Sequence, residues 1–209
     1  ITNENRVGDL TEKLIKNSIA LIVVHTTFDA FKEGTSKIMA ELLELKVKDF
    51  LIPDNNYDER GMGIIAEPIN DLTAEELLNK VHHICNSPIR FSKNYNEKFI
   101  KNIAIVGGSG MSFLDSVIRK NIDAFITADI TYHRFHEVQN KILLIDPGHY
   151  ELEQFVPYAL NRVLSQSFAY DNLDFTVSKT HTNPVAYYPQ TENYKNLQKN
   201  YLKKIGINK

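Results

Sequence analysis

The feature that most constrains this chain is a series of short, β-rich apolar runs, each followed at once by polar residues. The runs cover residues 19–24, 103–106, 124–126 and 142–145, and stretches with helical spacing lie before or between them. Continuous apolar runs of this length are typical of strands buried on both faces, and their alternation with helices is typical of a mainly parallel sheet. The sequence therefore predicts an α/β fold.

The size and charge of the chain exclude several classes of partner. Its 209 residues, 43% of them hydrophobic, are enough for one substantial core or two small ones. The 24 Lys and Arg residues nearly balance 26 Asp and Glu, and the net charge of -2 gives no long-range attraction for nucleic acid or anionic lipid. We therefore expect neither a nucleic-acid partner nor a membrane partner.

The single cysteine, Cys85, indicates a reducing compartment. One thiol makes no internal disulfide and no thiolate metal site by itself, and a buried, inert thiol is favoured over a reactive one. The sequence contains no run of about 18 apolar residues, and residues 2–8 form a mainly polar stretch, so neither a membrane span nor a signal peptide is visible. We expect a cytoplasmic protein.

Local signals divide the chain into further elements. Thr73 precedes residues 74–83 as a helix cap, with acidic residues in the first turn, which predicts a helix there. Turn-forming residues cluster between residues 49 and 63 and predict an irregular connection. After Pro189 the composition predicts a solvated helix or tail.

Residues capable of chemistry follow every apolar run. They are His25 and Asp29 after the first run, glycines 107, 108 and 110 after the second, Thr127, Asp129 and His133 after the third, and His149 and Glu153 after the fourth. Because the loops that leave the carboxyl ends of parallel strands gather in one crevice, we expect these side chains to lie at one edge of the sheet.

His149 and Glu153 are the best candidates for metal ligands. They are four residues apart, so a helix that starts near Gly148 would place them one turn apart on the same face. An imidazole and a carboxylate so placed can bind one cation, and Asp29 could add an oxygen, which gives a donor set suited to Zn, Mn, Fe or similar ions. The alternative is a surface pair with a capping role, which the spacing alone does not exclude.

The other candidates have competing structural explanations. The glycines at 107–110 could aim backbone N–H groups at a phosphate, but the P-loop Lys and the full dinucleotide spacing are missing, so a tight turn is favoured. His133 is a candidate general acid or base, and Asp129 a candidate for orienting ligands or water, although loop hydrogen bonds explain both nearly as well. The adjacent His82 and His83 fall at a helix end, where they favour the helix dipole.

Taken in order, five motifs resemble those of the NGG-interacting-factor family, whose bacterial members are often labelled GTP cyclohydrolase I type 2 homologs. The motifs are HTTFD at 25–29, GGSG at 107–110, ITADITYH at 126–133, DPGHYELE at 146–153 and TNPV at 182–185. The resemblance covers residues 6–188. It implies a two-lobed α/β fold, with mixed, mainly parallel sheets flanked by helices, and a ring-shaped hexamer. The expected lobes are residues 1–60 with 141–190, and residues 61–140, followed by a tail at 191–209.

The resemblance also implies a site with two divalent metal ions. It assigns metal ligation to Asp29, His149 and Glu153, and it places His25 and His133 near the metals, where proton transfer is a plausible role. The family's adjacent histidine pair lies upstream of the HTTFD-like motif, and this chain begins after that point. We therefore expect an N-terminally incomplete copy of the family's pattern.

Hydrolysis is the chemistry that such a site favours, because bound metal ions polarise a substrate oxygen and lower the pKa of water. We expect a metal-dependent hydrolase that acts on a nucleotide-like small molecule, with ring opening of GTP as the reaction that the family label implies. Two alternatives stay open. One is a non-enzymatic, metal-binding oligomeric scaffold or regulator, and the other is a nucleotide-binding glycine loop without metal.

Overall fold

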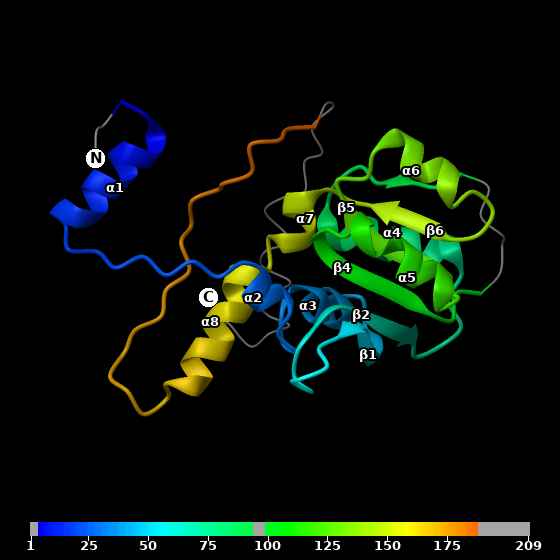
Figure 1. Ribbon diagram of the computed structural model, residues 1–209, viewed down its shortest axis with the longest axis horizontal. Helices are drawn as coiled ribbons and strands as arrows, with labels where there is room; N and C mark the ends of the chain where they lie inside the picture. Colours follow the sequence, from blue (N-terminus) through cyan, green and yellow to red (C-terminus); the bar gives the residue numbers. More distant parts are fainter. Residues whose placement is uncertain (1–3, 94–98, 188–209) are drawn as a thin grey trace.

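A single six-stranded sheet forms the centre of the computed structural model, which describes residues 4–93 and 99–187 (Figure 1). The strands are β1 (Leu45–Pro53), β2 (Gly61–Pro68), β3 (Arg90–Phe91), β4 (Ile103–Ser109), β5 (Ala124–Ala128) and β6 (Leu143–Asp146). Their order across the sheet is β1-β2-β4-β5-β6-β3. The tail expected at residues 191–209 lies outside the described residues.

Helices cover both faces of this sheet, which confirms the α/β class. The described residues form α1 (Arg6–Lys16), α2 (Thr26–Asp29), α3 (Thr35–Leu42), α4 (Ala74–Cys85), a short 3₁₀ turn η1 (Met111–Phe113), α5 (Leu114–Arg119), α6 (Tyr132–Glu137), α7 (His149–Glu153) and α8 (Val156–Ser167), and α1 lies apart from the sheet. In the described part of the chain, none of these helices has the length and apolar character needed to span a membrane.

The sheet pairs its strands in both directions. The central strands β4, β5 and β6 are parallel, whereas β1–β2, β2–β4 and β3–β6 are antiparallel. The expectation of mainly parallel pairing therefore holds only for the centre of the sheet. Strands from both expected lobes share this sheet, and the division into lobes stays a prediction.

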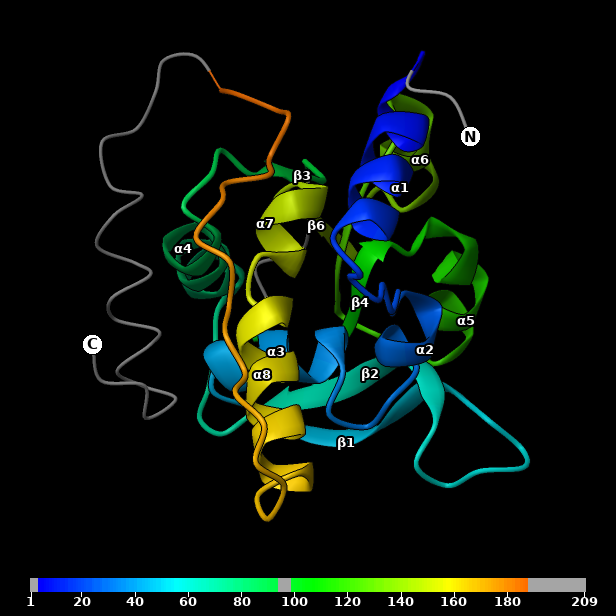
Figure 2. The same ribbon diagram turned by 90° about the vertical axis from the view of Figure 1, so that its left-hand side faces the viewer.

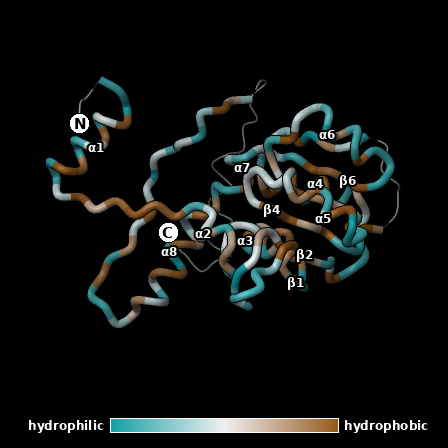
Figure 3. The backbone as a smooth tube through the Cα atoms, in the orientation of Figure 1, coloured by the Kyte–Doolittle hydropathy of each residue, from teal (hydrophilic) through white to brown (hydrophobic). Residues whose placement is uncertain are grey.

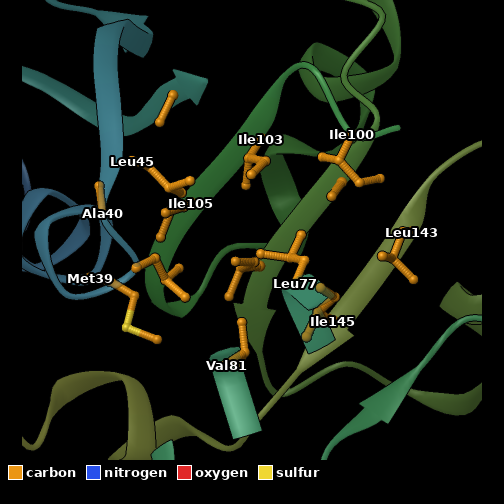
Figure 4. Packing of buried hydrophobic residues seen from close by; sticks show 14 of the residues in the cluster. Met39, Ala40, Leu45, Leu77, Val81, Ile100, Ile103, Ile105, Leu143 and Ile145 are labelled. Carbon is orange, nitrogen blue, oxygen red and sulfur yellow. The ribbon is translucent and has the colours of Figure 1, made fainter. Parts of the chain in front are cut away.

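The parallel strands are buried on both faces, as their continuous apolar runs predict. On β4, Ile103 and Ile105 pack into the core cluster that contains Leu77 and Val81 of α4 (Figure 4). The alternate residue Ala104 faces the opposite cluster, which α5 covers. Side chains alternate between the faces of a strand, so a strand between two helical layers needs apolar residues at every position.

The apolar run at residues 19–24 is not a strand, and the prediction of one there is wrong. Among the described residues this run pairs with no strand, and Ile22 and Val23 are 86% and 75% exposed. It leads away from the sheet to α1, and Figure 3 shows it as a hydrophobic segment outside the core. Apolar character favours burial, but a strand also needs a neighbour to bond its backbone groups.

The irregular connection expected at residues 49–63 is shorter than predicted. β1 continues to Pro53 and β2 begins at Gly61, so the turn covers residues 54–60, where the Asp54 N–H donates to the Arg60 carbonyl at 2.9 Å. The pairing register of β1 shifts between Val47 and Asp49. This irregularity interrupts the alternation of apolar and polar residues that identifies a strand in a sequence.

The helix predicted at residues 74–83 is present and extends to Cys85. Thr73 caps it: the Glu76 N–H donates to the Thr73 hydroxyl at 3.2 Å, and the Thr73 N–H donates to the Glu76 carboxylate at 2.8 Å. This reciprocal capping box satisfies two backbone donors that a helix start otherwise leaves unpaired. His82 and His83 lie in the last turn, as expected.

Candidate functional site at the carboxyl edge of the sheet

Helix α7 brings the two principal candidate ligands together. Gly148 lies between β6 and the helix. Its φ of +104° is a backbone conformation that residues with a side chain rarely adopt. The helix begins at His149 and ends at Glu153, and His149 Nε2 lies 3.3 Å from Glu153 Oε1. The four-residue spacing thus gives the contact on one helix face that the sequence predicts.

The other ring nitrogen of His149 is held by the neighbouring strand end. Nδ1 of His149 lies 2.6 Å from Oδ2 of Asp129, the residue that follows β5. When Nδ1 carries the proton, it donates to the carboxylate, and Nε2 keeps its lone pair beside Glu153. Asp129 therefore fixes both the orientation of the ring and the nitrogen that is available for a ligand.

Charges around His149 and Glu153 shift both of their pKa values. Burial lowers the pKa of His149, but the hydrogen bond to Asp129 and the charges of Glu153, Asp129 and Asp29 outweigh burial and raise it. The pKa of Glu153 is also raised, first by burial and then by Asp29 and Asp129, while His149 and His25 act in the opposite direction. Three carboxylates thus act on one imidazole, and a cation at this point would relieve their mutual repulsion.

Helix α2 places the two remaining residues of this group near α7. Asp29 ends the helix, and its Oδ1 accepts a hydrogen bond from the Thr35 hydroxyl, at the start of α3, at 2.6 Å. His25 precedes the helix, and its charge lowers the pKa of Glu153. Asp29 and His25 therefore lie within electrostatic reach of α7, although they come from the opposite end of the chain.

The structure does not bring His133 into this group. His133 lies on α6 and is exposed, and its ring packs edge-on against Tyr132 with the centroids 5.5 Å apart. Within the described residues, no interaction joins it to His149 or Glu153. The catalytic role expected for His133 stays a prediction from the sequence.

The glycine-rich end of β4 forms a wall of the site. Gly108 has φ +60°, and a Cβ atom there would lie 2.4 Å from Glu153 Oε1 and 3.1 Å from His149 Nε2. The neighbouring amides are used inside the protein: Gly107 N–H donates to the Ser36 hydroxyl at 3.2 Å, and Gly110 N–H to the Thr127 hydroxyl at 2.8 Å. These bonds favour the tight-turn interpretation over a phosphate-binding loop.

The donor chemistry of the site fits a divalent cation, although its ligands are not gathered into a complete set. One imidazole nitrogen and one carboxylate oxygen face each other, and the missing side chain of Gly108 leaves room beside both. In the part of the chain that the structure describes, no three His, Cys, Asp or Glu side chains converge closely enough to hold a metal ion.

The sequence did not reveal an ion pair that connects two loops of the site. Asp146, at the end of β6, has a side chain only 2% exposed, and it accepts hydrogen bonds from Ile130 N at 3.2 Å and Gly148 N at 3.1 Å. It also pairs with Arg90, whose Nη2 donates to the Ile130 carbonyl at 2.9 Å. The pairing of β3 with β6 is not visible in the sequence. The only sequence signal for this ion pair is the acidic residue that directly follows a buried apolar run.

The fold and the site together define an α/β protein with an acidic and histidine-containing cluster at the carboxyl edge of a mixed sheet. Residues 1–184 match the family described as Duf34/NIF3 (NGG1p interacting factor 3). The chain belongs to this family, as its five motifs indicate.

Curated relatives and solved structures agree with this assignment. A protein of Streptomyces coelicolor named GTP cyclohydrolase 1 type 2 homolog is 35% identical over 153 residues, 70% of this chain and 53% of that protein. One of Clostridium perfringens with the same name is 30% identical over 187 residues, 88% of this chain and 70% of that protein. The chain thus spans only about half the length of the Streptomyces coelicolor relative.

Two crystal structures share the fold. A hypothetical protein of Staphylococcus aureus has a TM-score of 0.79 at 24% identity, over 88% of this chain and 74% of that one. A Bacillus cereus protein related to NIF3 has a TM-score of 0.77 at 18% identity, over 90% of this chain and 79% of that one. At this level of identity, the likeness shows the fold alone.

Proposed function

We propose that this protein binds two divalent metal ions, of Zn, Mn, Fe or a similar element, and that Asp29, His149 and Glu153 are ligands. The observation that carries the proposal is the double restraint on His149. Asp129 holds its Nδ1 at 2.6 Å, while its Nε2 faces Glu153 at 3.3 Å. A histidine that ligates a metal commonly donates its other ring N–H to a carboxylate in this way.

The chemistry that follows from the proposal is hydrolysis. A divalent metal ion, when bound, polarises a substrate oxygen and lowers the pKa of water. Asp129 would keep His149 in the orientation that ligation requires. His25 is the proposed proton-transfer residue, because it directly precedes α2 and acts electrostatically on Glu153. For His133 the same role rests on the sequence motif alone.

The substrate in this proposal is a nucleotide-like small molecule in the cytoplasm, and the assembly is a hexamer. The name shared by the curated relatives, GTP cyclohydrolase 1 type 2 homolog, points to ring opening of GTP as the specific reaction. The formal net charge of -2 supports a small-molecule substrate over nucleic acid, because it offers no general attraction for a phosphate backbone.

Metal titration tests the proposal directly. Calorimetric titration of the metal-free protein with Zn²⁺ and with Mn²⁺ should show binding that Glu153→Gln and His149→Ala abolish. Glu137→Gln is the control, since this exposed carboxylate on α6 pairs with Arg134, and it should leave the affinity unchanged. Equal affinity in Glu153→Gln and the wild type would refute the metal site. Incubation of the metal-loaded protein with GTP, followed by mass analysis of the products, tests the reaction.

A second candidate is a non-enzymatic, metal-binding oligomeric scaffold. The observation that favours it is the exposed apolar run at residues 19–24, together with α1, which buries no residue. Exposed apolar patches are typical of surfaces that bind other proteins. A scaffold should bind metal and form oligomers in light scattering, but it should release no product from GTP under any metal condition.

A further inference from the structure

A cavity of about 1040 Å³ extends from the candidate metal site, and its size suits a nucleotide-sized ligand. Asp129, His149 and Glu153 border it on one side. The opposite wall comes from the extended segment at residues 177–185 with Tyr187, which runs beside α8 and α7 (Figure 2).

A hydrogen bond joins the two walls. Asn183, on the extended segment, donates from Nδ2 to Oε1 of Glu151 at 3.0 Å. Glu151 lies on α7 and is only 1% exposed. A buried carboxylate requires a hydrogen-bond partner, so this contact fixes the segment against the helix.

Aromatic side chains from both walls border the cavity. Tyr150 of α7 and His181 of the extended segment have ring centroids 5.3 Å apart with their planes inclined by 50°. Tyr158 of α8 is a third aromatic residue in the lining. Rings in this arrangement provide a surface on which a planar, aromatic ligand stacks.

Two cationic side chains, Arg90 and Lys179, also line the cavity. Arg90 is held in place by Asp146 and by the Ile130 carbonyl, yet its side chain is 59% exposed. Both of these bonds use Nη2, so its remaining N–H groups can meet an anion. Asp146 also accepts from Gly148 N, which places Arg90 beside the loop that carries His149.

We propose that this cavity binds the substrate as a phosphorylated aromatic ring compound, a nucleotide. The ring stacks on Tyr150 and His181, and the phosphates extend toward Arg90, Lys179 and the metal site. The inference rests on the proposed function, and it deepens that function by assigning the ring and the phosphates to different residues. Four carboxylates also line the cavity: Asp146 pairs with Arg90, Glu151 accepts a hydrogen bond from Asn183, and Asp129 and Glu153 belong to the proposed metal site.

Equilibrium dialysis with GTP, guanosine and inorganic triphosphate tests this division, in excess Mn²⁺ and in excess chelator. His181→Leu should weaken GTP and guanosine about tenfold or more and leave inorganic triphosphate unchanged, because only the stacking surface is lost. Lys179→Gln should weaken GTP and inorganic triphosphate but leave guanosine unchanged. Tyr170→Leu and Lys120→Gln, which alter residues outside the cavity lining, should behave as the wild type.

Several outcomes would overturn the inference. The first is a wild-type protein that binds GTP neither with Mn²⁺ nor with chelator. The second is unchanged GTP affinity in His181→Leu. The third is a variant in which the affinities for all three probes fall equally. Metal content is measured on the same samples. A protein that binds Mn²⁺ but not GTP refutes the cavity assignment and leaves the metal proposal standing. A protein that binds GTP in chelator but takes up no Mn²⁺ refutes the metal proposal alone.

Discussion

His149 Nδ1 lies 2.6 Å from Asp129 Oδ2, so the first helix after β6 is joined to the loop after β5. The two strands are parallel neighbours, and their carboxyl ends meet at the same edge of the sheet. Asp129 itself has φ +56°, a left-handed conformation that Asp and Asn tolerate better than most residues. The backbone at this point is thus shaped to present the carboxylate to the imidazole.

Asp129→Asn should lower the affinity for Mn²⁺ or Zn²⁺ about 10- to 100-fold, the usual effect of removing a partner that orients a metal-bound histidine. Asn keeps the left-handed backbone, so the unfolding free energy should change little. Calorimetric titration measures the affinity, and urea denaturation measures the stability. Asp115→Asn, an exposed position on α5, is the charge-matched control. Unchanged affinity in Asp129→Asn would remove the orienting role from Asp129.

Gly108→Ala should abolish metal binding, because its Cβ would lie 2.4 Å from Glu153 Oε1 and 3.1 Å from His149 Nε2. The new methyl group would displace both proposed ligands. Asn140→Ala is the control for a positive backbone angle, since Asn140 has φ 61° at an exposed position. Gly108→Ala should lose more stability than Asn140→Ala, because only its new Cβ meets other side chains, and only Gly108→Ala should lose metal in elemental analysis. Equal metal content in the two variants would contradict the proposed position of the ion.

The sequence predicts those parts of the fold in which the residue type suits both the local backbone conformation and the burial of that position in the whole structure. Strands β4, β5 and β6 are apolar at nearly every position because helices cover both faces. Helix α4 begins at a capping box that is visible in the sequence. The run at residues 19–24 shows the limit: its composition is that of a strand, but pairing depends on a neighbour, which composition does not specify.

In the site, too, contacts within one element are predictable from the sequence and contacts between distant elements are not. The His149 and Glu153 contact comes from the geometry of a single helix, so spacing predicts it. Asp146 and Arg90 are 56 residues apart in the sequence, and Arg90 lies on the short strand β3. No local sequence pattern predicts their contact. The position of His133 after β5 predicts that it lies near the site, whereas α6 begins at Tyr132 and leaves His133 on an exposed surface.

Cys85 should make the protein less stable at alkaline pH. Burial raises the pKa of the Cys85 thiol, and the negative charge of Glu151 raises it further. The folded state keeps the proton, while the unfolded chain loses it above a pKa of about 8.5. The contribution to stability is therefore complete below that pH and is lost progressively as the pH rises, by up to about 1.4 kcal/mol per pH unit.

Urea denaturation at pH 7, 9 and 10 tests this dependence on Cys85. The unfolding free energy should fall more steeply with pH in the wild type than in Cys85→Ala. The native thiol should also react slowly with a disulfide reagent at pH 8 and rapidly in urea. Parallel pH profiles of the two proteins, or fast labelling of the native state, would show that the thiol is not buried.

Arg90→Ala should destabilise the protein more than the loss of an ordinary surface ion pair. Its partner Asp146 has a side chain only 2% exposed, so removal of Arg90 leaves a buried carboxylate with only its hydrogen bonds from Ile130 N and Gly148 N. The expected cost is about 1–3 kcal/mol, the penalty for a buried polar group that loses a partner. Arg134→Ala is the control, because Arg134 and Glu137 are both 46% exposed and such pairs contribute about 0–1 kcal/mol. Urea denaturation followed by circular dichroism compares the two variants, and equal losses would mean that Asp146 does not depend on Arg90.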